Sequence, residues 1–149
     1  MFVGEYSHNL DSKGRLAVPY RMRAELAEGA VVTRGVDGCL VLYSRSEWSK
    51  LAERIANLPL SSAQARRFGR FFLAGAAEVE FDKQGRILLP TYLREHADLG
   101  SPTSPAGSVV AGEVVVAGMY NRVELWSTAR WSEQRTNLTP EEDLAALEI

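Results

Sequence analysis

The segment DSKGRLAVPYRMR occupies residues 11–23 and recurs 71 positions later as DKQGRILLPTYLR, residues 82–94. The aspartate, the glycine, the proline and two arginines are identical in the two copies, and three further positions keep apolar residues. A segment of this length that returns within one chain indicates a duplicated structural unit. The rest of the chain is therefore interpreted as two copies of one unit.

The first half of each unit predicts two strands joined by a tight turn. Residues 2–10 alternate in the manner of a strand, and the Asp-x-x-Gly of residues 11–14 predicts the turn. Aspartate bonds the amides ahead of it, and glycine accepts positive φ without a steric penalty. The chain then returns as a strand through Val18, and Pro19 suits the first turn of a short helix.

The second half of each unit predicts a hairpin followed by a capped helix. VVTRGVDGCLVLY, residues 31–43, is β-rich and is divided by an Asp-Gly turn, and residues 114–126 match it. Ser44 begins an S-x-x-E capping box ahead of an apolar stripe at helical spacing, and Ser127 has the same place in the second copy. The short loop at 27–30 is replaced there by a Pro-, Gly- and Ser-rich loop.

These matches divide the chain into four parts. They are repeat 1 at 5–48, a helical connector at 49–75, repeat 2 at 76–131 with an inserted loop at 98–113, and a C-terminal helix end with an acidic tail at 132–149. In the connector we expect a second helix over 60–74, capped by Ser61, and in the tail a short helix or a disordered segment. One unit buries too little surface alone, so the two copies should share one barrel with approximate two-fold symmetry.

Composition narrows the class of protein. The 149 residues are 46% apolar, and the sequence has no signal-peptide pattern and no apolar run of membrane-spanning length, which predicts a cytoplasmic protein without a membrane partner. The single cysteine, Cys39, allows no intrachain disulfide. The net charge of −2 disfavours nucleic acid, but four of the acids lie in the last eleven residues. Arg66, Arg67 and Arg70 are expected to form a solvated or intersubunit helix face.

The sequence indicates no enzyme. His8 and His96 have no metal-ligand partners at useful spacing, and Cys39 has no histidine or acid at a spacing typical of a nucleophile. No phosphate-binding glycine loop or serine elbow occurs. We therefore expect no catalytic residues, no metal and no cofactor.

The residues MFVGEYSHNLDSKGRLAVP, the second DKQGRILLP and the NRVELW ending resemble the MraZ family of bacterial transcriptional regulators, encoded at the start of the division and cell-wall gene cluster. Each half resembles a DNA-binding domain of the SpoVT-AbrB type, and the resemblance extends to about Leu138. It implies an α+β fold, a duplicated swapped-hairpin (double-split) β-barrel with flanking helices. It also implies a nucleoid-associated regulator that binds direct repeats of double-stranded DNA in its own promoter region as a ring-like homo-oligomer.

Carried over residue by residue, the resemblance places DNA-contacting arginines in both turns. They are Arg15 and Arg86, with Lys13 and Lys83 beside them, while Asp11, Asp82, Gly14 and Gly85 position the motif. Arg21, Arg23 and Arg94, on the short helices, are either phosphate contacts or solubilising charge. The residues alone favour a simpler interpretation, a charged turn with a local Asp–Arg ion pair.

Two questions stay open at the level of sequence. Lys13 in the first copy corresponds to Gln84 in the second, so the copies need not contact DNA equally. The alternative function is an oligomeric protein-interaction scaffold without specific DNA binding, in which the basic turns are incidental.

Overall fold

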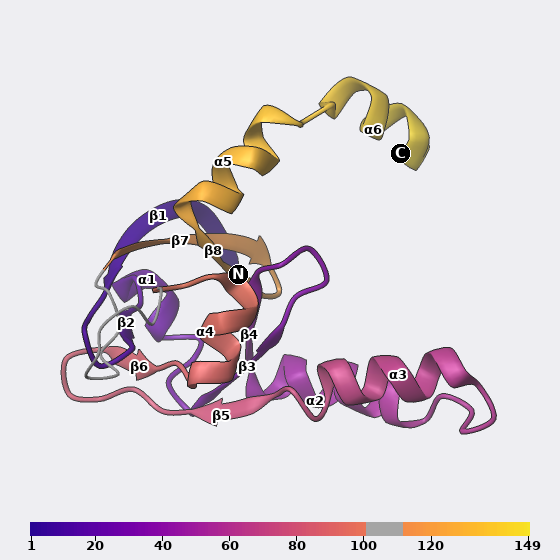
Figure 1. The fold of residues 1–149 in the computed structure, drawn as a ribbon, viewed down its shortest axis with the longest axis horizontal. Coiled ribbons are helices and arrows are strands. Elements are labelled where there is room, and N and C mark those ends of the chain that lie inside the picture. Colours follow the sequence, from indigo (N-terminus) through magenta and orange to yellow (C-terminus); the bar gives the residue numbers. More distant parts are fainter. Residues whose placement is uncertain (101–111) are drawn as a thin grey trace.

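The computed structural model describes residues 1–100 and 112–149, which contain eight strands and six helices (Figure 1). The strands are β1 (Phe2–Leu10), β2 (Arg15–Ala17), β3 (Ala30–Arg34), β4 (Leu40–Ser44), β5 (Ala77–Val79), β6 (Arg86–Leu88), β7 (Gly112–Tyr120) and β8 (Val123–Ser127). The helices are α1 (Tyr20–Arg23), α2 (Arg45–Ala56), α3 (Ala63–Phe72), α4 (Thr91–Ala97), α5 (Thr128–Thr136) and α6 (Pro140–Leu147). Residues 101–111 of the predicted inserted loop lie outside this description.

All the described strands belong to one antiparallel sheet in the order β5-β3-β4-β8-β7-β1-β2-β6. The sheet curls into a nearly closed barrel, and its two edge strands, β5 and β6, are consecutive in the chain. In the turn that connects these two edge strands, the Asp82 amide donates to the Arg86 carbonyl at 2.9 Å. The barrel thus leaves little free strand edge, as expected when two repeats share one barrel.

The two repeats exchange strands instead of folding separately. β1 of the first repeat pairs with β7 of the second from Phe2↔Tyr120 to Leu10↔Gly112, and β5 pairs with β3. β2 and β6 pair around Leu16↔Ile87, which are equivalent positions in the sequence repeat. This pairing confirms the predicted fold class, an α+β duplicated swapped-hairpin barrel with approximate two-fold symmetry.

Alternation along the strands creates two cores. On β4, Leu40 and Leu42 are fully buried inside the barrel, whereas Val41 and Tyr43 face outward. The outward side chains join a second apolar cluster, in which Trp48 of α2 stacks on Phe72 of α3 with ring centroids 5.3 Å apart. Because successive side chains of a strand point to opposite faces, the same strand supplies the barrel interior and the outer surface on which the helices pack.

The helical caps agree with the sequence at two places and differ at a third. The hydroxyls of Ser44 and Ser127 accept from the amides three residues ahead, as predicted. In the connector the cap is Ser62, which accepts from the Ala65 amide at 3.2 Å, so the prediction of Ser61 was wrong. The helix consequently begins later than expected.

Two helical projections leave the barrel (Figure 1). One is the hairpin of α2 and α3, and the other is α5 continued by α6, so the acidic tail forms a helix. None of the described helices combines the length and apolarity needed to cross a membrane.

Candidate nucleic-acid interface

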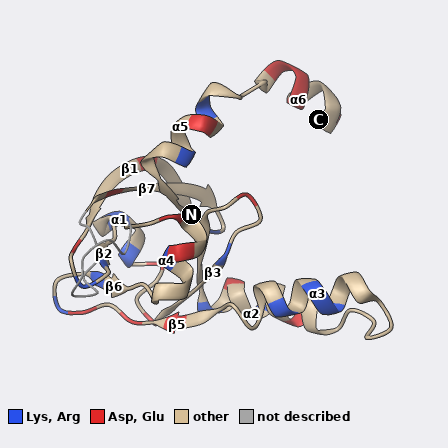
Figure 2. Cartoon of the chain, in the orientation of Figure 1, with Lys and Arg blue, Asp and Glu red and all other residues tan. Residues whose placement is uncertain are grey.

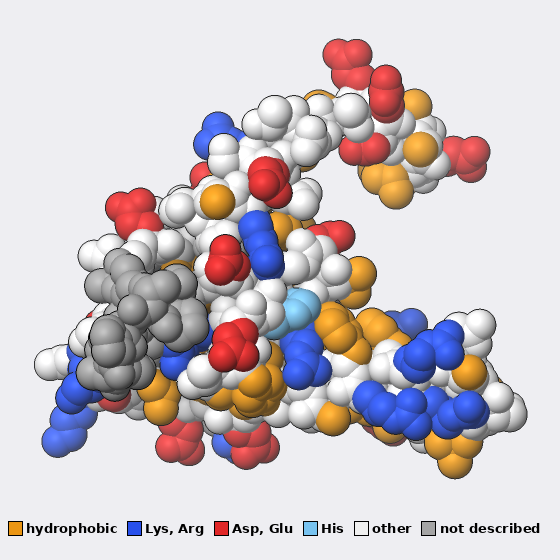
Figure 3. All heavy atoms as spheres, in the orientation of Figure 1, with side chains coloured by type: hydrophobic (Ala, Val, Ile, Leu, Met, Phe, Trp, Pro, Cys, Tyr) orange, Lys and Arg blue, Asp and Glu red, His pale blue; other side chains and the backbone are white. Residues whose placement is uncertain are grey.

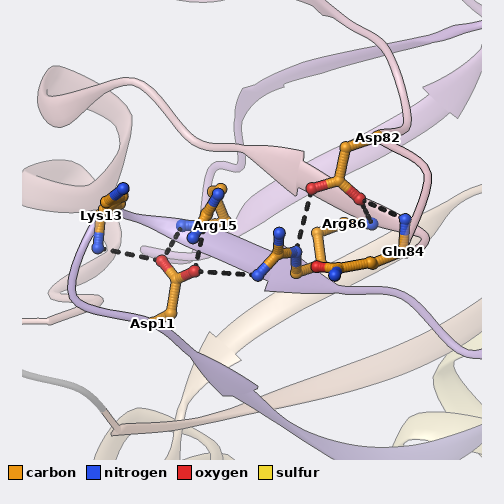
Figure 4. Close-up of polar contacts among 6 residues, drawn as sticks. All are labelled: Asp11, Lys13, Arg15, Asp82, Gln84 and Arg86. Carbon is orange, nitrogen blue, oxygen red and sulfur yellow. Dashed lines mark hydrogen bonds and ion pairs between the residues drawn. The ribbon is translucent and has the colours of Figure 1, made fainter.

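The two repeated turns have the same hydrogen-bonded structure. Asp11 Oδ1 accepts from the amides of Lys13 and Arg15, both at 2.9 Å. Asp82 Oδ1 accepts from the amides of Gln84 and Arg86, also both at 2.9 Å (Figure 4). The predicted turns are therefore confirmed, and the aspartate is their organising side chain.

Gly14 and Gly85 are required for conformation and for space. Their φ angles are +82° and +74°, a region that side chains with a Cβ rarely adopt. A Cβ on Gly14 would lie 2.9 Å from Arg94 Nε, and one on Gly85 would press closer still on the Arg23 guanidinium. Each turn glycine thus makes room for an arginine of the other repeat.

Arg23 and Arg94 brace the turns across the pseudo-symmetry axis. Their Nε atoms donate to the carbonyls of Val18 and Leu89, each at 3.0 Å. The main chain adds reciprocal bonds, from Val18 to Gly85 at 3.2 Å and from Leu89 to Gly14 at 2.9 Å. The sequence analysis did not predict this structural role. One signal of it was present, because Arg23 follows Gly14 and Arg94 follows Gly85 by the same number of positions in the two repeats.

Arg15 and Arg86 project from one outer surface of the β2–β6 ribbon. Directly paired residues of a sheet point to the same side, and the ribbon pairs Arg15 with Leu88 and Arg86 with Ala17. Leu16 and Ile87, between them, point into the barrel and are fully buried. The duplicated turns therefore present their arginines together.

Each arginine is held by its own aspartate through Nε. Arg15 Nε donates to Asp11 Oδ2 at 2.7 Å, and Arg86 Nε donates to Asp82 Oδ2 at 2.9 Å. Asp11 Oδ2 also lies 3.5 Å from a terminal nitrogen of Arg86, which links the two motifs (Figure 4). The local ion pair is thus present, and within the described chain the terminal nitrogens of Arg15 carry no hydrogen bond.

The turn contacts lower the pKa of both aspartates. At Asp11, partial burial opposes ionisation, but bonds from the Arg15 amide and guanidinium and from the Lys13 amide outweigh it and lower the pKa. At Asp82, the Arg86 amide is the main cause that lowers the pKa, with further bonds from Gln84 and the Arg86 side chain. Both carboxylates are therefore charged at neutral pH.

The remaining bases surround these motifs. Lys13, Lys83 and Arg21 are exposed, the two lysines at the turns and the arginine on α1. In Figure 2, ribbon positions occupied by Lys and Arg lie close together on α1, β2, β6 and the β5–β6 turn. We call this surface the paired-turn face and define it as Asp11, Lys13, Gly14, Arg15, Arg21, Arg23, Asp82, Lys83, Gly85, Arg86 and Arg94. Its bases outnumber its acids by seven to two.

Other candidates have ordinary structural roles. His96 Nε2 lies 3.0 Å from the Gly35 carbonyl, and its ring packs edge-on against Phe71. Burial raises the pKa of the Cys39 thiol to about 12, so the reactive thiolate is suppressed. The described residues contain no group of three or more His, Cys, Asp or Glu that could hold a metal.

Comparison with known proteins yields one family. The family model described as "MraZ protein, putative antitoxin-like" matches twice, over residues 1–71 and 72–148. "Transcriptional regulator MraZ" of Halothermothrix orenii is 51% identical over 131 residues, which cover 88% of this chain and 84% of the relative. The proteins of the same name from Heliobacterium modesticaldum and Caldanaerobacter subterraneus are 48% and 47% identical, covering 94% and 89% of this chain and 90% and 85% of their own.

Proposed function

The chain belongs to the MraZ family, and we propose that it is a sequence-specific DNA-binding transcriptional regulator that contacts double-stranded DNA through its paired-turn face. The names of its relatives support regulation of transcription. The net positive charge of the face supports a polyanionic partner. Such a role needs no catalysis and no cofactor.

The observation that carries this proposal is the fixed orientation of Arg15 and Arg86. Each aspartate engages Nε and also closes the turn, so the guanidinium and the backbone are positioned by one carboxylate. The terminal nitrogens of Arg15, and at Arg86 the terminal nitrogen that does not face Asp11, then remain for a guanine or a phosphate. Orientation before binding reduces the entropy lost when the contact forms.

The other basic residues of the face have supporting roles in this proposal. Lys13, Lys83 and Arg21 contact phosphates, which position the protein without reading sequence. Arg23 and Arg94 hold the turns through Val18 and Leu89 and add positive potential. Affinity should accordingly fall as salt rises, because each neutralised phosphate releases counterions.

The finer features of the proposal rest on the family resemblance. The DNA sites are direct repeats in the promoter of the protein's own division and cell-wall gene cluster, which places the protein in the cytoplasm at the nucleoid. A ring-like oligomer engages several repeats at once, so that weak individual contacts add as avidity. Occupation of the promoter by the oligomer then regulates transcription.

The decisive experiment compares Arg15→Ala and Arg86→Ala with wild type by fluorescence anisotropy on DNA from upstream of the chain's own gene. Loss of a bidentate base contact costs about 1–3 kcal/mol, so each variant should bind roughly 5- to 150-fold more weakly. The matched control is Arg67→Ala, an exposed arginine of α3 far from the turns, which should bind as wild type does.

Two outcomes would contradict the proposal. Unchanged affinity in both variants, with native circular dichroism, would remove these arginines from the interface. Equal indifference of the wild type to the upstream DNA and to an unrelated duplex would favour the interaction scaffold instead.

A further inference from the structure

The α2–α3 hairpin carries an open apolar groove that the proposed DNA contact does not use. The groove has a volume of about 380 Å³, and its apolar lining includes Ile55, Leu58, Leu60 and Leu73. Leu58 and Leu60 are 43% and 81% exposed, which is unusual for large apolar residues that lie together. Arg66 and Arg70 also line the groove, so it combines apolar surface with positive charge.

Gly69 gives the groove a floor without a side chain. It lies inside α3, where glycine is less favourable than alanine by roughly 0.5–1 kcal/mol. A Cβ at this position would meet nothing within 4 Å, so the packing of the chain does not require glycine here. A missing side chain on an open helical face lets another helix approach closely, as small residues do in helix pairs.

The complementary feature is α6. Leu144 and Leu147, three positions apart on one face of this helix, are 55% and 66% exposed. Glu141, Glu142 and Asp143 lie in its first turn, and the helix contains no base. Figure 3 shows acidic and apolar side chains together on α6, and basic and apolar side chains together on the α2–α3 hairpin. The two surfaces match in both polarity and charge.

The structure favours a neighbouring copy over the same chain as the source of this helix. α5, which precedes α6, is fixed to the barrel because Trp131 Nε1 donates to Glu5 at 2.9 Å and its ring packs on Trp126. α6 then stands away from the α2–α3 hairpin, and every residue of α6 is exposed (Figure 1). Docking within one chain would have to rearrange the connection between α5 and α6, where the Asn137 amide donates to the Glu133 carbonyl at 3.1 Å.

We propose that α6 of one copy docks into the α2–α3 groove of the next copy. Leu144 and Leu147 enter the apolar groove over Gly69, and the acids of α6 meet Arg66 and Arg70. A contact between two different surfaces is head-to-tail, and it generates a ring when the rotation closes. The inference therefore rests on the proposed oligomer and supplies its contact.

The test uses two full-length variants that disable opposite halves of this contact. Gly69→Leu fills the groove from a position where the added Cβ meets no atom within 4 Å. Leu144→Ser/Leu147→Ser removes the apolar stripe. Each variant alone should elute as a single chain in size-exclusion chromatography with light scattering. Mixed at high concentration, they should form a 1:1 pair and nothing larger, because one still offers the helix and the other still offers the groove.

Controls and contradicting outcomes are equally specific. Gly69→Ala and Ala145→Ser, the latter off the apolar stripe, should keep the wild-type mass. Wild-type mass in both disabling variants, failure of the mixture to pair, or a wild type that is always a single chain would each overturn the proposal. So would a change in hydrogen exchange of α6 without a change in mass, which would indicate docking within one chain. None of these results would change the DNA affinity expected for Arg15→Ala. The proposal of DNA contact and the proposal of α6 docking can therefore be refuted independently.

Discussion

A single carboxylate has two functions in each turn of the paired-turn face. Asp11 Oδ1 accepts two amides and closes the turn, while Oδ2 accepts the guanidinium of Arg15. The ion pair is about one-third exposed, so its direct contribution to stability is small. The aspartate therefore acts mainly by fixing geometry, because the same carboxylate holds both the backbone of the turn and the side chain of the arginine.

Gly85→Ala should destabilise the fold by about 1–3 kcal/mol. The residue has φ +74°, and a Cβ there would collide with the guanidinium of Arg23, so strain and a disturbed brace combine. The matched control, Gly69→Ala in the open helix α3, should stabilise the fold by about 0.5–1 kcal/mol. Urea unfolding of the three proteins measures both changes, and an unaltered midpoint for Gly85→Ala would refute the need for glycine.

The turn aspartates should make stability depend on pH in the acid range. Their folded-state pKa lies below the ordinary value of 3.8, so their contribution is present above that pH and is lost as the pH falls through the lower folded-state pKa. The difference in unfolding free energy between wild type and Asp11→Asn/Asp82→Asn should therefore be constant near neutrality and shrink below about pH 3.8. Denaturant titrations across this range would disprove the effect if the difference stayed constant.

The sequence predicted the turns but not their mutual bracing. Asp-x-x-Gly acts over four residues, so its geometry can be inferred locally. The packing of Arg23 on Gly85, and of Arg94 on Gly14, joins residues more than sixty positions apart and depends on strand exchange. The sequence alone does not distinguish an arginine on a short helix that contacts a phosphate from one that packs against a neighbouring turn.

The attachment of α3 to the barrel depends on a buried polar contact. Thr33 of β3 is fully buried, and its hydroxyl donates to the Phe72 carbonyl at 2.7 Å. Arg34 donates to the Phe71 carbonyl at 3.2 Å, so two carbonyls in the last turn of the helix are satisfied from one strand. A threonine within a β-rich run gave no indication of this partner, and the expected helix 60–74 proved shorter, at 63–72.

Thr33→Val should lower the unfolding free energy by about 1–2 kcal/mol. Valine keeps the shape but leaves the Phe72 carbonyl without its donor, and a buried unsatisfied acceptor costs roughly 1–3 kcal/mol. Thr128→Val, at an exposed threonine, is the control and should change stability by less than about 0.5 kcal/mol. In Thr33→Val, amide hydrogen exchange should become faster in α3 than in wild type, with a smaller change in β7. An equal increase in both elements would argue against this anchoring role.

The whole molecule is a pseudo-dimer whose halves cannot be separated without breaking the sheet. β1·β7 and β5·β3 are both pairings between repeats, so each half supplies the partner strands of the other. The duplication in sequence was enough to predict a shared barrel. The groove over Gly69 was not predictable, because a glycine in a helix is informative only when the surrounding space is known.

Assembly should change the affinity for tandem sites more than the affinity for one site. If linked paired-turn faces act together, wild type should bind a duplex with several sites at least tenfold more tightly than a duplex with one, because later contacts become intramolecular. Gly69→Leu should lose this advantage yet retain the one-site affinity, since the groove lies on the α2–α3 hairpin, far from the paired-turn face. Each barrel should still neutralise the same number of phosphates, so the salt slope on the one-site duplex should be equal for both proteins. Anisotropy titrations on both duplexes at several salt concentrations make this comparison, and an equal tandem advantage in Gly69→Leu would separate DNA binding from assembly.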